Sequence, residues 1–427
     1  MNTVDDTYHS LLARHDAMRL RRRLFSPAGT GWQGAEGAGG TASTAGKAAA
    51  PQQPYDGAAD QRVITDHLEL VTPFEDLIAH LYDAMFAHWP YLRQLFPESM
   101  EFQRKHLEAI FWYLIENLHD PDAVAATFTR LGRDHRKLGV RPAHYRAFES
   151  ALCEALRRTA GPRWSEGMER AWVRMLRFAV AAMVEGAEAA LGEPAAWQAT
   201  VTDHDLRRAD LAVLRVRPHE PYPYRAGQFA SVASPALPQA WRQYSVACAP
   251  RPDGELEFHV KLTGRGGVSE ALLTRTRVGD VLRLGPPGGT MTLDGEDAAH
   301  DLLFVAADTG WAAAKALLQE LAGHRVAQRG VHLFLGVRHP SALYDTESPA
   351  ELRRHYPWLR VTQVTGEGPG PGEYGALADV VAGHGDWSRH LAFVSGPPAM
   401  AGPLVARLTA EGVPAERVRH DPLPDRV

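Results

Sequence analysis

The sequence predicts a multidomain protein with three folds in order along the chain: an all-α domain, an antiparallel β-barrel and an α/β domain. Three changes of pattern support this prediction. Apolar residues follow helical spacing over residues 62–191, short β-rich runs between Pro and Gly turns begin at Trp197, and apolar runs alternate with helical segments from His300. A chain of 427 residues has room for these domains, at about 100–200 residues per domain.

The composition excludes several classes of protein. A net charge of −5 provides no basic field that would attract nucleic acid. The two cysteines, Cys153 and Cys248, lack the spacing of a disulfide framework, a thiolate zinc site or an iron–sulfur cluster, and they fit a reducing cytosol. Asp308 and Lys315 interrupt the longest apolar stretch, and no signal-peptide pattern is visible, so we expect a cytoplasmic protein without stable membrane insertion.

Residues 1–60 form a tail and linker in our interpretation, and we expect them to be disordered. Residues 28–60 are rich in Gly, Ala, Ser, Thr, Pro and Gln and lack periodic apolar positions, which is typical of a flexible linker. The preceding segment, residues 8–25, contains Arg19 and the run Arg21–Arg23. Two interpretations stay open for it: a basic helix that contacts a partner or a membrane surface, or a solvated tail.

The helical domain is assigned to residues 61–194, and its first strong signal is a helix start. Thr72 is expected to cap the helix, with Pro73 at the first helical position and Glu75 completing a capping box. Apolar residues then continue on one face until Pro90 ends or kinks the helix. Four more helices are expected, over residues 102–114, 124–135 (with Gly139 as C-cap), 143–158 and 165–191.

Two further domains are assigned to residues 195–298 and 299–427. In the first, strands are expected at residues 210–216, 229–232, 256–262 and 281–284, as in a small antiparallel barrel. In the second, apolar runs at residues 302–306, 331–337, 359–364 and 391–395 alternate with helical segments, as in a mostly parallel sheet.

Three polar residues lie at core-facing or first-turn positions of the helical domain. His135 is a candidate haem ligand, because a buried neutral imidazole binds iron through one nitrogen and a protein group through the other; the alternative is a packed core histidine. The hydroxyl of Tyr82 and the amide of Gln103 need partners when buried, and a ligand bound at the iron would supply one. Their alternatives are a tyrosine whose hydroxyl reaches water and an exposed glutamine.

In combination these residues resemble the globin domain of bacterial flavohemoglobins. The segment from Ala79 to Phe86, followed by Pro90, Leu92 and Phe96, is similar to that family's distal tyrosine helix and corner phenylalanine. Gln103-Arg104 with Leu107 is similar to the distal glutamine and leucine, His135 falls at the proximal ligand position, and Tyr145 at the tyrosine behind it. The resemblance covers nearly the whole helical domain. It implies a haem b site with a haem contact from each of Phe96 and Leu107, iron ligation by His135, and catalytic roles for Tyr82, Gln103 and Tyr145.

The chain departs from the family at one proximal position. There the family has a glutamate, late in the last helix, that holds the proximal histidine together with the tyrosine. Counting from Trp172 places this position at Ala187 or Ala189, and Glu185 and Glu188 are close but out of register. An anionic partner makes an imidazole more basic, so its absence predicts weaker catalysis.

Arg242-Gln243-Tyr244-Ser245, in the expected barrel, resembles the flavin signature of ferredoxin-reductase-like enzymes. The resemblance implies that the arginine pairs with the pyrophosphate, the tyrosine stacks on the isoalloxazine and the serine hydrogen-bonds flavin N5. A guanidinium fork suits phosphate, and a flat ring suits a flat ring. Upstream, Tyr224-Arg225-Ala226-Gly227-Gln228-Phe229 resembles the strand that precedes this signature.

A second phosphate contact is expected downstream. Val260-Lys261 is followed by Gly264-Arg265-Gly266-Gly267-Val268-Ser269, where glycines let backbone N–H groups approach a phosphate at a helix start. Alone, this would be an ordinary turn; at this distance from the flavin signature it resembles the family's second pyrophosphate contact. Two separate phosphate contacts favour FAD over FMN.

The last domain is expected to bind NADH or NADPH. Ala307-Asp308-Thr309-Gly310 occupies the family's glycine-rich turn, but Asp308 stands where a glycine is expected and Ala313 where a proline is expected. Because a carboxylate repels pyrophosphate, weakened nucleotide binding is expected. Ser395-Gly396-Pro397 resembles the family's Cys-Gly-Pro-Pro motif, with serine replacing cysteine. Arg338, near the expected adenosine ribose, leaves the choice between NADH and NADPH open.

The resemblance implies an oxidoreductase that passes electrons from NAD(P)H through FAD to haem and converts nitric oxide and dioxygen to nitrate. Three alternatives stay open. A haem-based redox or gas sensor would use the tail as its output arm. A six-coordinate haem, with His106 or another distal residue at the iron, would only transfer electrons. A nicotinamide site weakened by Asp308 would leave the chain dependent on an external electron donor.

Overall fold

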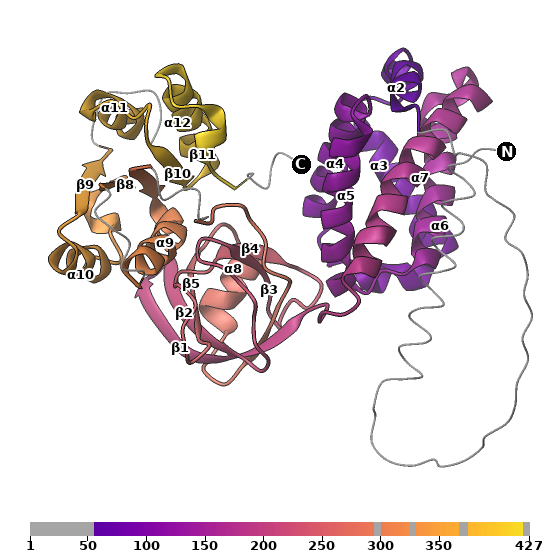
Figure 1. The fold of residues 1–427 in the computed structure, drawn as a ribbon. Helices are drawn as coiled ribbons and strands as arrows, with labels where there is room; N and C mark the ends of the chain where they lie inside the picture. Colours follow the sequence, from indigo (N-terminus) through magenta and orange to yellow (C-terminus); the bar gives the residue numbers. More distant parts are fainter. Residues whose placement is uncertain (1–54, 294–299, 324–329, 367–374, 422–427) are drawn as a thin grey trace, which may run out of the picture. The chain divides into compact units, whose positions relative to one another are not determined.

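The computed structural model describes residues 55–293, 300–323, 330–366 and 375–421, and its contacts divide the chain into two units with the boundary between Glu193 and Pro194. Figure 1 shows the ribbon of both units, with labels on many of their helices and strands. The basic segment at residues 8–25 and the expected linker up to residue 54 lie outside the described residues. No helix within the described ranges is long and apolar enough to cross a membrane.

The first unit is entirely helical. Its longer helices are α2 (Gly57–Thr65), α3 (Phe74–His88), α4 (Glu101–Asn117), α5 (Pro121–His135), α6 (Pro142–Ala160) and α7 (Glu166–Ala189). Short 3-10 turns connect them, at Leu68–Leu70, Pro90–Leu95, Arg136–Leu138 and Gly161–Arg163. Gly139, at a φ of 74°, ends the turn after α5, as the sequence predicted.

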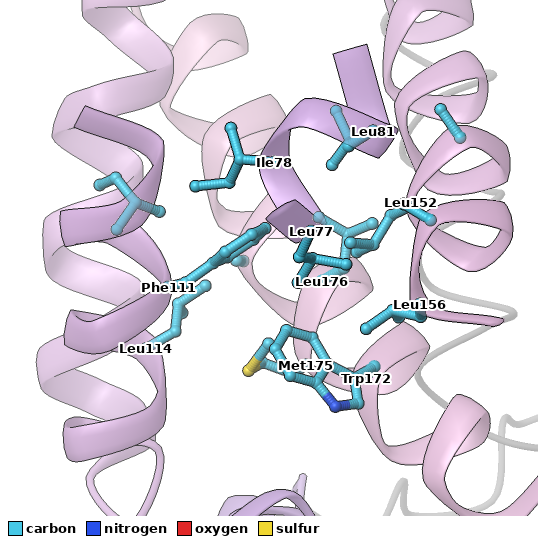
Figure 2. Packing of buried hydrophobic residues seen from close by; sticks show 14 of the residues in the cluster. Leu77, Ile78, Leu81, Phe111, Leu114, Leu152, Leu156, Trp172, Met175 and Leu176 are labelled. Atoms are coloured by element: carbon cyan, nitrogen blue, oxygen red, sulfur yellow. The ribbon is translucent and has the colours of Figure 1, made fainter. Parts of the chain in front are cut away.

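The core of this unit is built around α3. Figure 2 shows Leu77, Ile78 and Leu81 of α3 among apolar side chains from three other helices. These neighbours are Phe111 and Leu114 of α4, Leu152 and Leu156 of α6, and Trp172, Met175 and Leu176 of α7. Burial of such side chains provides the main driving force for folding, about 1.5–3 kcal/mol for each large one.

Helices α5 and α7 pack with their backbones in contact. A Cβ atom added at Gly132 of α5 would lie 1.9 Å from the carbonyl oxygen of Met183, and one added at Gly186 of α7 would lie 2.0 Å from that of Thr129. Only glycine fits at these two crossings. They set the position of α5, whose last residue is His135.

Two local predictions require correction. Helix α2 begins at Gly57, so the predicted linker does not extend to Asp60. The buried carboxylate of Asp60 accepts hydrogen bonds from Arg174, and Tyr55 stacks on Phe178 with ring centroids 4.5 Å apart. Thr72 is not the N-cap of α3 either, because its hydroxyl donates to the carbonyl of Leu68 in the preceding turn and the helix begins after Pro73.

The second unit begins with a nearly closed antiparallel barrel. Its strands are β1 (Trp197–Arg208), β2 (Leu211–Pro218), β3 (Phe229–Ala233), β4 (Arg242–Ser245), β5 (Leu256–Lys261) and β6 (Val281–Leu284), in the order β4-β3-β6-β1-β2-β5. A bridge between Val246 and Phe258 brings the two edges together. After β5, a short helix, α8 (Val268–Glu270), continues as one π turn.

The α/β domain has an all-parallel sheet in the order β11-β10-β7-β8-β9. Its elements are β7 (Leu302–Ala307), α9 (Trp311–Gly323), β8 (Val331–Val337), α10 (Glu347–His355), β9 (Leu359–Thr365), α11 (Gly375–His384), β10 (Leu391–Ser395), α12 (Pro398–Ala410) and β11 (Val418–Arg419). Alternate residues of β7 enter separate cores, Leu302 and Phe304 with α9 and Leu303 and Val305 with α11 and α12. Burial on both faces explains the continuous apolar runs in the sequence.

Candidate cofactor and substrate sites

His135 has the geometry of a metal ligand with one nitrogen already engaged. It is the last residue of α5, and its Nδ1–H donates to the carbonyl of Leu131 at 2.9 Å. Because Nδ1 carries the hydrogen, Nε2 is an acceptor, and it has no hydrogen-bond partner among the residues that the structure describes. Burial lowers the pKa of His135, which favours the neutral imidazole that can ligate iron.

Two polar groups on α3 and α4 also lack protein partners. The ring of Tyr82 is buried against Phe86 and Phe96, with centroid distances of 5.8 and 5.7 Å, and its hydroxyl makes no hydrogen bond within the described ranges. The Oε1 atom of Gln103 is buried without a hydrogen-bond partner in the same unit. Buried polar atoms are normally paired, so the Gln103 oxygen is a candidate for contact with a bound ligand. The hydroxyl of the buried Tyr82 is a second candidate. Leu107, one turn after Gln103, packs partly buried at the edge of the core.

His106 lies on the same helix as Gln103. It stacks on Phe102 with ring centroids 5.8 Å apart, and burial lowers its pKa. Its charge also lowers the pKa of His135, so the two imidazoles are close enough to interact electrostatically. The six-coordinate alternative therefore stays a prediction that spectroscopy can decide.

The Nδ1 hydrogen of His135 is accepted by a backbone carbonyl, where flavohemoglobins are expected to have a glutamate carboxylate. Because the Nδ1 hydrogen is donated to Leu131, no glutamate accepts it among the residues described. Glu185 is exposed and Glu188 half-buried on α7, while Tyr145 of α6 packs partly buried against the core. The nearest carboxylate in sequence, Asp134, accepts from the buried ammonium of Lys137.

The flavin signature lies on β4. It pairs with β3 so that Ala230 lies opposite Tyr244 and Val232 opposite Arg242. Alternate residues of a strand share a face, so Arg242 and Tyr244 point to one side and Gln243 and Ser245 to the other. Burial lowers the pKa of the Arg242 guanidinium and raises that of the Tyr244 hydroxyl. A half-buried cation beside an aromatic ring fits a flavin nucleotide.

The upstream residues of the flavin prediction have their polar groups hydrogen-bonded to other parts of the protein. The Tyr224 hydroxyl donates to the carbonyl of Cys248 at 3.2 Å. The Gln228 amide accepts from the backbone N–H of Arg225 at 2.9 Å and donates to the carbonyl of Gly289 at 3.3 Å. These contacts hold the loop before β3 in place, so a direct cofactor contact from either side chain stays a prediction.

The glycine-rich loop after β5 already binds one of the protein's own carboxylates. The backbone N–H of Gly266, at a φ of 74°, donates to the carboxylate of Glu270 at 2.7 Å, and an added Cβ at Gly266 or Gly267 would meet nothing within 4 Å. An open backbone that accepts a carboxylate can accept a phosphate. Ser269, in contrast, is buried and bonded to Thr263, so its hydroxyl faces inward.

The glycine-rich turn after β7 contains an ion pair. Asp308 has a φ of +50°, and it is the one non-glycine residue with positive φ in the described ranges. This left-handed conformation explains why a glycine is expected at this position. Its carboxylate accepts from Lys261 of β5 at 2.8 Å. The expected repulsion of pyrophosphate is therefore offset by a neighbouring ammonium group.

The two nucleotide motifs lie together at the carboxyl ends of β7 and β10. A Cβ atom at Gly310 would lie 2.2 Å from the carbonyl oxygen of Ser395 and 2.6 Å from the nitrogen of Gly396, so this close approach requires glycine. Thr309 belongs to the same turn as Gly310, and Pro397 caps α12. Between β10 and β8 the order of the sheet changes direction at β7, the position where α/β folds bind ligands.

A cleft beside this turn includes residues that the sequence analysis did not single out. Its lining residues are Asp308, Trp311, Leu335, Val337, Ala342, Leu343, Tyr344 and Asp345. Behind Tyr344 lies a buried polar group formed by Glu257, His259 and Lys315. The signal in the sequence was a strand with polar residues at alternate positions, Glu257 and His259, ahead of Lys261.

Comparisons with known proteins agree with this arrangement. The Globin family model matches residues 79–183, and the model described as oxidoreductase FAD-binding domain matches residues 198–293. A flavohemoprotein of Bordetella pertussis is 30% identical over 252 residues, covering 54% of this chain and 62% of that one. The reductase component DmpP of phenol 2-monooxygenase from Pseudomonas sp. strain CF600 is 27% identical, covering 46% and 56%. The chain thus spans less than two thirds of the length of these curated relatives.

One solved structure shares the fold across both units. The flavohemoglobin of Malassezia yamatoensis, determined with bound FAD and haem, superposes with a TM-score of 0.69 at 18% sequence identity. The superposition covers 85% of this chain and 98% of that one. At 18% sequence identity, this likeness shows a shared fold and nothing more.

Proposed function

We propose that this chain, a globin joined to an FAD-binding oxidoreductase module as in flavohemoglobins, carries electrons from NADH or NADPH through FAD to haem and converts nitric oxide and dioxygen to nitrate. One electron balances the reaction NO + O2 + e⁻ → NO3⁻. A nicotinamide nucleotide delivers two electrons as hydride, so one nucleotide supports two turnovers.

The observation that carries this proposal is a set of polar groups without protein partners in the helical core of the first unit. This core holds an imidazole whose Nε2 has no protein partner in the described ranges, together with the hydroxyl of Tyr82 and the Oε1 atom of Gln103, which have none either. The Oε1 atom of Gln103 is fully buried, and leaving such an atom without a partner costs free energy. A haem with a small ligand would supply a metal for the imidazole nitrogen and a hydrogen-bond partner for the other two groups.

Each residue then has a defined role. His135 would hold the iron through Nε2, and the Leu131 carbonyl keeps the ring in the required tautomer. Tyr82 would orient the reacting gas by hydrogen bonding, supported by Gln103, and Phe96 and Leu107 would form the apolar wall. Arg242 would bind the pyrophosphate of FAD, and Tyr244 would stack on its ring. When bound, the cofactors supply the electron and oxygen chemistry, and the protein supplies their position.

A second candidate is electron supply by another protein. It is favoured by the carboxylate of Asp308 in the turn where a dinucleotide phosphate is expected. The ion pair with Lys261 weakens this argument, because it neutralises that carboxylate.

The test begins with the absorption spectrum of the purified full chain, followed by anaerobic addition of NADH or NADPH. We expect a Soret band with flavin absorbance, and a shift to ferrous haem on nucleotide addition. A nitric oxide electrode should then record consumption under air, with nitrate as product. Haem and flavin that stay oxidised with both nucleotides would contradict the proposal and favour an external donor. A low-spin ferric spectrum without added ligand would favour the electron-transfer alternative.

A further inference from the structure

One strand of the barrel carries polar side chains at three alternate positions, and each bonds to a different segment of the α/β domain. Glu257, His259 and Lys261 lie on β5, so their side chains leave the same face of the strand. Glu257 contacts Lys315 of α9, His259 contacts Tyr344, and Lys261 contacts Asp308. We refer to these three β5 residues as the seam.

The first contact of the seam is a buried ion pair. The Glu257 carboxylate accepts from the Lys315 ammonium at 2.7 Å, and from the Nε of Arg215 at 3.3 Å. Burial raises the pKa of Glu257, but hydrogen bonds from His259 and Lys315 outweigh it and hold the pKa below its usual value. Glu257 is therefore a carboxylate that can fix the hydrogen on His259.

The second contact links that carboxylate to the wall of the cleft. His259 Nε2 lies 3.1 Å from Glu257, and Nδ1 lies 2.7 Å from the Tyr344 hydroxyl. Because a carboxylate only accepts, Nε2 carries the hydrogen and Nδ1 accepts from the hydroxyl. Burial lowers the pKa of His259, in agreement with this neutral form. The two rings meet edge to face, 5.3 Å apart.

The same network holds the rest of the wall. Tyr344 and Asp345 line the cleft together with Trp311. The Trp311 indole donates to Asp345 at 2.9 Å, and Lys315 lies 3.5 Å from the same carboxylate. Tyr344 thus lines the cleft while its hydroxyl is bonded to His259 of the barrel, which does not line it.

We propose that the seam is a positioning device for the nicotinamide nucleotide: through His259 it fixes the Tyr344 ring in the cleft wall and so sets the geometry of hydride transfer to the flavin. Glu257, His259 and Tyr344 are positioning residues, since none is required to contact the reacting atoms. The inference rests on the proposed nucleotide reaction and adds the element that orients it. Small displacements are costly in such a step, because a shift of about 1 Å can slow a reaction about a hundredfold.

The test compares the Tyr344→Phe variant with the full-length wild type. Phenylalanine keeps the ring and removes only the hydrogen bond to His259. In anaerobic stopped-flow mixing at saturating NADH or NADPH, we expect flavin reduction to slow about tenfold per bound flavin, while the dissociation constant of the nucleotide changes less than about threefold. Tyr344→Leu, which also removes the ring, should slow the step further. Amide hydrogen exchange over residues 340–346 should become faster in both.

A matched control is Thr202→Val. Thr202 on β1 donates to Glu255 at 2.7 Å, so this variant also removes one side-chain hydrogen bond of the barrel, but away from the cleft. It should leave the flavin reduction rate unchanged. A structural role alone would lower FAD content or the unfolding midpoint without changing the rate per bound flavin.

The possible outcomes distinguish failure of the seam proposal from failure of the proposed function. If the rate of flavin reduction is unchanged in Tyr344→Phe while the wild type is reduced normally, the positioning role of the seam is overturned and the proposed function still stands. Unchanged hydrogen exchange over residues 340–346 would also overturn it, whatever the cofactor content. A wild type that neither nucleotide reduces would overturn the proposed function and the role of the seam in hydride transfer with it.

Discussion

Lys261 and Asp308 form an ion pair, 2.8 Å from Nζ to Oδ2, that joins the end of β5 in the barrel to the first turn after β7. Both side chains are mostly buried, so the pair is less screened than one at the surface. A carboxylate at a position where glycine is expected is thus tolerated because a cation from another domain neutralises it.

This pair predicts opposite effects of two substitutions. Lys261→Gln would leave the Asp308 charge facing the phosphate of the nucleotide, and KM for NAD(P)H should rise on the order of fivefold, which corresponds to about 1 kcal/mol. Asp308→Gly would remove the charge and suit the left-handed backbone, and KM should fall. The measurement is flavin reduction at varied nucleotide concentration.

The double variant is the control for this interpretation. If Lys261 acts by neutralising Asp308, then Lys261→Gln should have little effect when Asp308 is already glycine. Equal effects of Lys261→Gln in both backgrounds would indicate that the lysine contacts the nucleotide directly.

Tyr82→Phe should reduce nitric oxide consumption without loss of stability. The hydroxyl has no protein hydrogen bond in the described part of the chain, so its removal leaves no protein group unpaired. We expect consumption to slow about 10- to 100-fold if the hydroxyl binds the reacting gas. The matched control is Tyr113→Phe, which removes a hydroxyl bonded to Thr127 at 2.8 Å. That variant should lose about 1 kcal/mol of unfolding free energy and keep its turnover. The reverse pattern would contradict the assignment.

Gly132→Ala should destabilise the helical unit. The new methyl group would overlap the carbonyl of Met183, which cannot move without separating α5 from α7. We expect a loss of about 3 kcal/mol in urea unfolding, together with weaker haem retention because His135 ends the same helix. Gly167→Ala in α7 is the comparison, since its nearest neighbour would be Ser165 Oγ at 3.7 Å. It should be neutral or slightly stabilising.

The α/β domain should lose stability in acid through His332. Burial first, and then the neighbouring charges of His384, Arg360 and His390, lower the pKa of His332 from 6.5 to about 4. Between pH 6.5 and 4, the imidazole of His332 is protonated in the unfolded chain but stays neutral in the folded domain. The free energy of unfolding therefore falls as the pH decreases from 6.5 toward 4, and His332 has no effect on it above pH 6.5.

The measurement for His332 is the urea midpoint between pH 4 and 7. The His332→Gln variant should show a shallower decline than the wild type, by at most about 1.4 kcal/mol per pH unit for one proton. Parallel curves would show that other groups account for the acid sensitivity. His355, an exposed histidine whose ring bonds the carbonyl of Glu351, provides the control substitution.

Much of the fold could be predicted because the signals are local. The helical spacing after Phe74 and the apolar runs that became β7, β8, β9 and β10 all lie where they were expected. Strand β4, in contrast, was not expected as a strand. Its four residues carry little apolar pattern. The start of α2 was missed because its carboxylate, Asp60, is buried only through Arg174, 114 residues away.

The sequence by itself determined the order of the domains and the identity of most candidate residues, since periodicity and motif spacing are properties of neighbouring positions. It could not show that Leu131 takes the hydrogen of His135 where a carboxylate was expected, or that Lys261 lies against Asp308. Nor could it bring Glu257, His259 and Tyr344 together. Those contacts join segments up to 85 residues apart, and they follow from which face of β5 meets the α/β domain. Only the tertiary structure decides that packing, and with it whether a buried charge repels a ligand or is neutralised.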